Sequence, residues 1–314
     1  MIDTEKIRKD FPVYDRDING KPIIYMDSAC VSMKPKQVIE AINRYYNEFP
    51  ACGGRSIHKL GKQVDEEVLK TRKEVKGFFN AKSEKEIIFT KNTTESINLV
   101  ANSFKFEKDD IMLTSDKEHN SNLLPWQVND KVEHRIFKFG DIEDFKEKVK
   151  GVKMVSIVHT SNLDGTSNPV KEMIKIAHEN NALVLLDAAQ SAPHKEVDVR
   201  KLDVDFLACS GHKMLGPSGT GVLYGKLELL EELKPFLVGG DTVKETTYTE
   251  HEFEDIPERF EAGLQNYAGI IGLGEAIRYL KKIGLDNIHE HEVMLNKQIT
   301  EGLKDVKGLK IIGP

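Results

Sequence analysis

A lysine and an aspartate, each next to an apolar run, carry the clearest chemical potential in this sequence. Lys213 stands in the string SGHKMLGP at 210–217, and Asp187 ends the apolar run 183–187. A lysine amine can bond covalently to an aldehyde, and a carboxylate can keep a nearby ring nitrogen protonated. Pyridoxal phosphate (PLP) needs both groups, so the pair predicts a PLP site.

The neighbours of Lys213 agree with this prediction. Ser210 and His212 can donate hydrogen bonds to phosphate oxygens, and the two glycines of the string allow close backbone approach. A surface lysine in a glycine-rich turn would explain Lys213 alone. It would not explain the combination with Asp187 and Gln190.

The elements that must position these residues alternate between apolar runs and amphipathic stretches. We expect strands at 86–90, 110–115, 132–139, 153–159, 183–187, 205–209 and 221–224. We expect helices at 36–49, 61–79, 92–104, 121–127, 142–149, 170–180, 268–282 and 285–306, then a last strand at 309–312. This order predicts an α/β fold, a mostly parallel sheet with helices on both faces. Ligands of such sheets bind at the carboxyl ends of the strands.

Composition excludes several classes of protein. The net charge is −6 over 314 residues without a polybasic block, so no nucleic-acid partner is expected. The polar, acidic start at 1–6 is not a signal peptide, and the apolar runs are too short for a membrane span. Three widely spaced cysteines do not form a disulfide framework. We therefore expect a cytoplasmic protein.

Several strings together resemble the class V aminotransferase family of fold-type I PLP enzymes, and most closely its group II cysteine desulfurases and selenocysteine lyases. Besides the Asp187 and Lys213 motifs they are 25–29, 91–98, 118–127, 159–162 and 259–263. The resemblance implies a large PLP-binding domain at 1–262, with 1–20 packing on a smaller domain. That smaller domain would begin at 263–314 and be truncated here, because the family continues further.

The resemblance also assigns roles within the cofactor site. Thr93 and Thr94 open a helix after a strand, where amide groups and the helix dipole favour the cofactor phosphate; taken alone the pair could be an ordinary helix cap. His119 would stack on the PLP ring and shuttle protons. Gln190 would donate to the ring O3′, and Asn162 would orient substrate or cofactor.

The activity implied by the family is removal of sulfur from L-cysteine, giving alanine and a persulfide or sulfide for iron–sulfur cluster or thio-cofactor assembly. Arg55 and His58 resemble a loop that the family places near the substrate, where an arginine could clamp a carboxylate; a plain surface arginine is the alternative. A sulfur-acceptor protein and a homodimer are further implied.

The three cysteines depart from the family pattern. The nucleophilic cysteine of the family lies beyond residue 314, and Cys30, Cys52 and Cys209 do not match it. All three fall in segments that line the cofactor site in the family. They could pack as small apolar residues, ligate an iron–sulfur cluster or a soft metal, or relay persulfide sulfur. A PLP sulfurtransferase or lyase using these thiols, and a non-catalytic PLP-binding scaffold, are therefore alternative functions.

Overall fold

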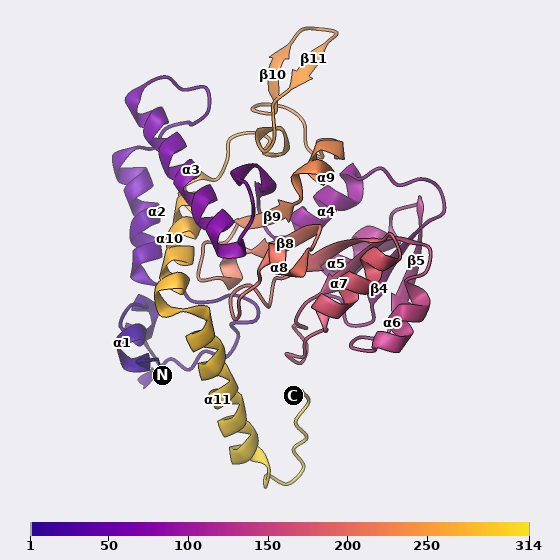
Figure 1. Cartoon of the computed structure of the whole chain (residues 1–314). Coiled ribbons are helices and arrows are strands. Elements are labelled where there is room, and N and C mark those ends of the chain that lie inside the picture. Colours follow the sequence, from indigo (N-terminus) through magenta and orange to yellow (C-terminus); the bar gives the residue numbers. More distant parts are fainter. Residues whose placement is uncertain (1, 314) are drawn as a thin grey trace.

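The computed structural model describes residues 2–313, which fold around one mixed sheet (Figure 1). The sheet has seven strands in the order β3-β9-β8-β7-β6-β4-β5. Strand β9 runs antiparallel to β3 and β8, and the other pairings are parallel. The strands are β3 (Ile87–Thr90), β4 (Asp110–Ser115), β5 (Val132–Phe137), β6 (Val152–Val158), β7 (Leu183–Asp187), β8 (Phe206–Ser210) and β9 (Gly221–Gly225). The predicted α/β class and mostly parallel sheet are confirmed.

Helices cover both faces of the sheet. One face packs against α3 (Lys59–Phe79), α6 (Ile142–Lys148), α7 (Val170–Glu179), α8 (Val199–Leu202) and α10 (Tyr267–Ile283). The other packs against α4 (Thr93–Ser103), α5 (Asn120–Gln127) and α9 (Leu227–Glu232). The remaining helices are α1 (Thr4–Arg8), α2 (Lys36–Glu48) and α11 (Leu285–Leu303), with short 3-10 turns η1 (Pro12–Asp15), η2 (Glu84–Glu86), η3 (Gly211–Lys213) and η4 (Glu258–Phe260).

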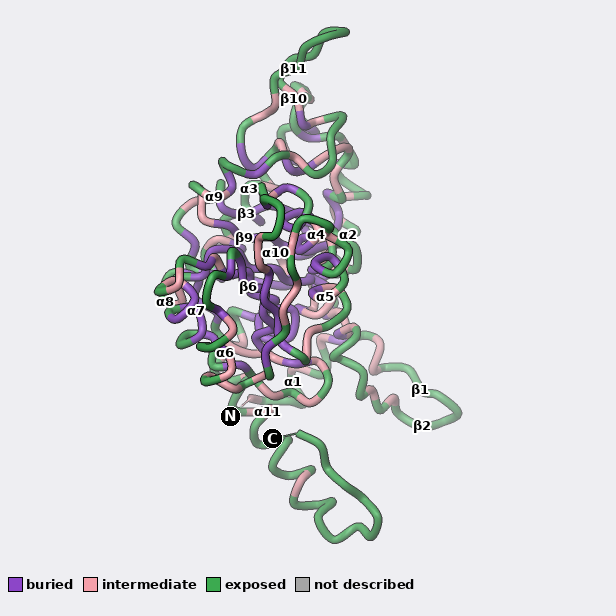
Figure 2. Tube along the Cα trace, turned by 90° about the vertical axis from the view of Figure 1, so that its right-hand side faces the viewer, coloured by how far each residue is buried: buried purple, intermediate pink, exposed green. Residues whose placement is uncertain are grey.

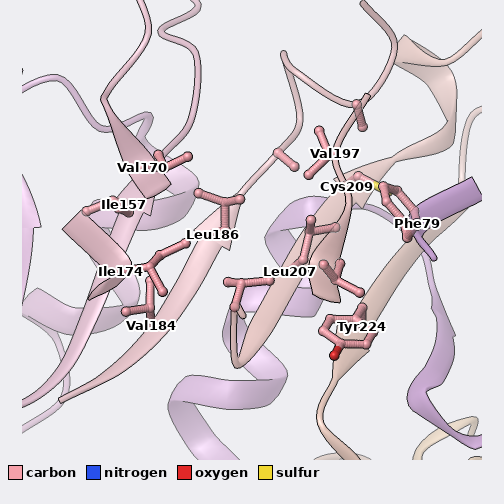
Figure 3. Packing of buried hydrophobic residues seen from close by; sticks show 14 of the residues in the cluster. Phe79, Ile157, Val170, Ile174, Val184, Leu186, Val197, Leu207, Cys209 and Tyr224 are labelled. Atoms are coloured by element: carbon pink, nitrogen blue, oxygen red, sulfur yellow. The ribbon is translucent and has the colours of Figure 1, made fainter. Parts of the chain in front are cut away.

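The central strands alternate strictly between the two cores. Leu186, Leu207 and Cys209 point into the core shared with α3 and α10 (Figure 3), whereas Leu185 and Phe206 point into the core shared with α4. Successive side chains of a strand face opposite sides of a sheet, so both cores come from the same short runs. This alternation also decides which polar side chains reach the site.

Three segments project from this body. The hairpins β1 (Asp17–Ile18) with β2 (Lys21–Pro22) and β10 (Val243–Thr246) with β11 (His251–Phe253) are largely exposed, and so is α11 (Figure 2). The strand expected at 309–312 is wrong, because these residues are exposed and without strand structure. A strand forms only against a neighbour that supplies backbone partners, and none pairs with this segment within residues 2–313.

Helix α10 belongs to the packing of the sheet. It contacts α2 and α3, and Ile270, Leu273 and Ile277 lie in the main core. Tyr279 of the same helix bonds through its hydroxyl to Asp10 (2.9 Å) and packs edge-on against Phe11. The division of the chain after residue 262 stays a prediction, and in the structure the helix that follows it packs on the first part.

Candidate active site

A cavity of about 430 Å³ lies at the carboxyl ends of the central strands and contains both residues of the Lys213–Asp187 pair. Asp187 is the last residue of β7, and Lys213 follows β8 in the η3 turn. Because β7 and β8 are parallel neighbours, their ends meet at one edge of the sheet. The predicted convergence of these two residues is therefore observed.

Burial sets the electrostatics of the pair. Asp187 is 3 % exposed, and its Oδ1 accepts a hydrogen bond from the Ala189 N–H (2.9 Å). Burial raises the pKa of this carboxyl, against the opposing effects of Ala189, Lys213 and His119. Burial likewise lowers the pKa of Lys213. A cation beside Asp187 would lower its pKa again, and a less basic Lys213 has more of the neutral amine that attacks a carbonyl.

One end of the cavity is built from hydroxyl groups and helix amides. Thr93 and Thr94 open α4, and the side chain of Asn92, not a threonine, caps the helix by accepting from Glu95 N (2.9 Å). The Ser210 hydroxyl accepts from Thr93 N (2.8 Å) and lies 2.7 Å from Thr93 Oγ1. These donors and the positive end of the α4 dipole suit a phosphate group.

His119 lines the cavity from the start of α5. Its Nδ1 accepts a hydrogen bond from Ser121 N (3.1 Å) and lies 2.9 Å from the Ser121 hydroxyl. A ring whose Nδ1 accepts carries its proton on Nε2 when neutral. The Ser121 hydroxyl is in turn 2.7 Å from Thr94 Oγ1, so a hydrogen-bond chain joins the phosphate-binding end to the imidazole.

The other predicted cofactor residues lie on the same wall. Asn162, Gln190 and His212 all line the cavity. Gln190 Nε2 donates to the carbonyl of Ala29 (2.7 Å), which holds the 27–30 segment against the site. Burial and the charges of Lys213 and Lys34 lower the pKa of His212, which favours the neutral imidazole.

The structure does not bring Arg55 and His58 to this cavity. Arg55 donates to the carbonyl of Val243 and lines a separate cavity of about 290 Å³. His58 caps α3 through its Nδ1, which accepts from Gly61 N (3.2 Å). Their role in binding substrate stays a prediction. Within one chain, Arg55 contacts the β10 strand and His58 caps α3.

The three thiols lie in different surroundings, so the predicted three-cysteine ligand set is not formed. Cys30 lines the cavity, and Cys52 lies outside it, with its thiol against the Gly53 carbonyl (3.4 Å). Cys209 is buried in the core (Figure 3), because it directly precedes Ser210 on β8 and so faces the opposite side of the sheet. Within residues 2–313 no group of three His, Cys, Asp or Glu side chains could hold a metal ion.

Two residues near the site were not assigned a role from the sequence. Ser121 supports His119, and a hydroxyl two residues after a histidine that precedes a helix was the available signal. Glu118 is half-buried, with Oε1 2.5 Å from the Ser115 hydroxyl and 3.0 Å from Val158 N, and Oε2 2.6 Å from Asn122 Nδ2. Burial raises its pKa to about 8. Its charge state could not be inferred from sequence, because these contacts are tertiary.

A larger open groove of about 1320 Å³ runs beside α7 and is lined by His159 and surface lysines and acids. It contains neither Lys213 nor Asp187, so size does not identify the site. No helix within residues 2–313 combines the length and apolar character needed to cross a membrane.

Comparison with known proteins agrees with this geometry. Residues 24–314 match the model of the family described as aminotransferase class-V. A probable cysteine desulfurase of Halalkalibacterium halodurans is 41% identical over 100% of this chain and 80% of its own length.

Two solved structures extend the comparison. The apo cysteine desulfurase of Thermococcus onnurineus NA1 superposes with a TM-score of 0.94 at 39% identity, covering 100% of this chain and 79% of that one. A cysteine desulfurase of Escherichia coli superposes with a TM-score of 0.90 at 30% identity, covering 98% and 79%.

Proposed function

Because this chain belongs to the class-V aminotransferase family, we propose that it is a PLP-dependent cysteine desulfurase. The observation that carries the proposal is the placement of Lys213 and Asp187 on one cavity wall, at the ends of adjacent parallel strands. L-Cysteine is the proposed substrate, alanine one product and a sulfur atom on an acceptor thiol the other.

The residues present fit PLP. A buried carboxyl with one internal hydrogen bond suits a protonated ring nitrogen, and the Thr93, Thr94 and Ser210 donors suit the phosphate. Lys213 would hold the aldehyde carbon covalently. His119 would lie against the ring, and Gln190 has a second amide hydrogen free for the ring oxygen while the first binds Ala29.

When bound, the cofactor supplies an electron sink that makes the α-proton of the amino acid acidic. Asp187 would hold the positive charge on the ring nitrogen throughout. Burial lowers the pKa of Lys213. Once the amino acid has displaced Lys213 from the aldehyde carbon, the free lysine amine would accept or return the α-proton. His119 would hold a proton on Nε2, because Ser121 N occupies its Nδ1.

Sulfur would pass from the substrate thiol to the thiolate of an acceptor. An acceptor thiolate attacks the substrate sulfur, the carbon–sulfur bond breaks, and its electron pair with a proton completes alanine. The acceptor becomes a persulfide without an external oxidant or reductant. We propose a sulfur-acceptor protein feeding iron–sulfur cluster or thio-cofactor assembly in the cytoplasm.

We further propose that the active form is a homodimer. Ile57 is 89% exposed and Leu264 is 72% exposed, so a single chain leaves apolar side chains that a second copy would cover. Fold-type I enzymes place the active site at the subunit boundary, so a second copy would bring the 53–58 loop to a cavity other than its own. Sedimentation equilibrium tests this state, and a monomer that retains full activity would contradict it.

A second candidate function places the acceptor within the chain. Cys30 is the one thiol of the three that lines the cavity, so sulfur transfer to it would make the protein a sulfurtransferase carrying a Cys30 persulfide. Mass spectrometry after incubation with cysteine distinguishes this function from transfer to a separate acceptor protein. A persulfide on Cys30 that is required for turnover favours the second, and full turnover by Cys30→Ser favours the first.

The proposal is tested by Lys213→Ala, with Lys175→Ala as a matched control because Lys175 is exposed on α7. The wild type and the control should show a visible absorbance band with PLP and release alanine from cysteine. Lys213→Ala should lose the covalent bond, seen as the absence of a borohydride-stable PLP adduct in its mass, and should release no alanine. A wild type without adduct or alanine would refute the proposal.

A further inference from the structure

The segment that follows Cys30 wraps around the turn that carries Lys213. Ser32 N (3.0 Å) and Ser32 Oγ (2.9 Å) both donate to the carbonyl of His212, and Leu215 N donates to Ser32 Oγ (2.9 Å). The ammonium of Lys34 donates to the same His212 carbonyl (3.0 Å) and to the carbonyl of Ser32 (2.5 Å). We call residues 32–34 the clasp. It ties the start of the chain to a turn 180 residues later.

Lys34 is an unusual cation for a structural contact. It is half-buried and forms no ion pair with a carboxylate within residues 2–313, so main-chain carbonyl oxygens stabilise its charge. Burial lowers its pKa to about 8. Lys36, two residues further on, pairs instead with Asp10 at the surface (3.2 Å). A half-buried ammonium without a carboxylate partner keeps part of its desolvation cost, which the two carbonyl bonds offset.

The turn that Lys34 contacts needs support from outside. Leu215 has a φ of 62°, in the left-handed region that costs a side-chain-bearing residue about 1 kcal/mol. Inside the turn, Gly211 O accepts from Met214 N (2.9 Å) and Gly216 N (2.8 Å). The clasp adds the bonds at His212 and Leu215, on either side of Lys213.

The carbonyl of His212 belongs to the same rigid peptide plane as the N–H of Lys213. Fixing that carbonyl therefore fixes the backbone N–H and Cα of Lys213, from which its side chain extends. We propose that Lys34 is a positioning residue for Lys213, one that holds the His212 carbonyl so that the Lys213 amine meets its aldehyde in the cavity. This inference rests on the proposed function, since it assumes that Lys213 binds PLP.

The test compares Lys34→Met and Lys34→Arg with Lys36→Met as the matched control. Two quantities are measured on each purified chain: the dissociation constant for PLP from the visible absorbance, and the fraction of Lys213 peptide carrying PLP after borohydride reduction. Lys34→Met should raise the dissociation constant about tenfold and lower the adduct fraction at saturation, because a charged hydrogen bond is lost. Lys34→Arg should recover most of both, and Lys36→Met should match the wild type.

Thermal unfolding without PLP separates positioning from stability. A Lys34→Met chain with a lower midpoint but an unchanged dissociation constant and adduct fraction overturns the inference. Where Lys34→Met does not fold, Ser32→Ala decides, because it removes the hydroxyl bonds to His212 and Leu215 and leaves Lys34 in place. A lowered adduct fraction in Ser32→Ala supports the clasp, and an unchanged one overturns it. A wild type without adduct refutes the proposed function instead.

Discussion

Glu261→Gln is expected to cause a large loss of stability, although Glu261 does not line the cavity that holds Lys213. Glu261 and Arg72 of α3 form a two-pronged ion pair, with both nitrogen–oxygen distances 2.9 Å and each side chain 7% exposed. Arg72 also donates to Ile87 O (2.6 Å), and Glu261 accepts from Phe89 N (2.7 Å). The pair therefore joins α3 and β3 to the 258–261 turn, and β3 leads directly to Thr93 and Thr94.

The magnitude follows from which groups lose a partner. Glutamine keeps an acceptor for Phe89 N but leaves the buried Arg72 guanidinium without its paired carboxylate. Removing one partner of such a pair costs about 3–5 kcal/mol, whereas replacing both costs far less. We expect a loss of about 3 kcal/mol for Glu261→Gln. The loss of stability in the Glu261→Gln and Arg72→Met double variant should be smaller than the sum of the losses in the two single variants, by at least about 2 kcal/mol.

Urea unfolding of the PLP-free chain measures this loss. The fluorescence of Trp126, which is fully buried and the one tryptophan of the chain, reports the core beside α4, and circular dichroism reports the helices. Glu143→Gln is the matched control, because its pair with Lys146 is exposed and should contribute less than about 0.5 kcal/mol. A loss below about 1 kcal/mol for Glu261→Gln, or additive losses in the double variant, would refute the reasoning.

Three further results are expected. Asp187→Asn should bind PLP yet form alanine about a hundredfold more slowly at saturating PLP, because an amide cannot stabilise a protonated ring nitrogen; an unchanged rate contradicts this. Iodoacetamide should label Cys30 in the folded chain, more slowly with PLP, and Cys209 only after unfolding, because burial raises the pKa of Cys209 to about 12; equal labelling by mass spectrometry contradicts this. Burial raises the pKa of Glu118 from 4.5 to about 8, so the folded state binds this proton more tightly than the unfolded chain. The free energy of unfolding should therefore fall from pH 5 to 8, and less steeply in Glu118→Gln; parallel curves contradict this.

The sheet was predictable because its strands are short apolar runs between helical stretches. The strands Asp110–Ser115 and Leu183–Asp187 have the expected bounds, and most others differ by one or two residues at an end. The expected strand at 309–312 failed because local apolar character does not supply a neighbouring strand. Pairing is a tertiary property, and the sequence of the segment alone does not carry it.

The residues that would hold the cofactor were predictable because they lie at the ends of predictable strands. Asp187 and Ser210 end adjacent parallel strands, and Lys213 follows one of them, so their meeting is a consequence of topology. The contacts of Ser32 and Lys34 with His212 were not predictable. They depend on how an irregular segment crosses the sheet edge, and no periodic pattern marks such a path.

The separation of the thiols shows where nearness in sequence to a functional residue misleads. Cys209 is adjacent to Ser210, yet the alternation of β8 sends one side chain into the apolar core and the other into the cavity. Cys30 is far from both motifs in sequence, yet the Gln190 bond to Ala29 and the clasp at His212 hold its segment against the cavity. Of these two thiols, the one that reaches the cavity therefore comes from a loop tied down by such bonds, since the side chains of β8 that share the parity of Cys209 point into the core.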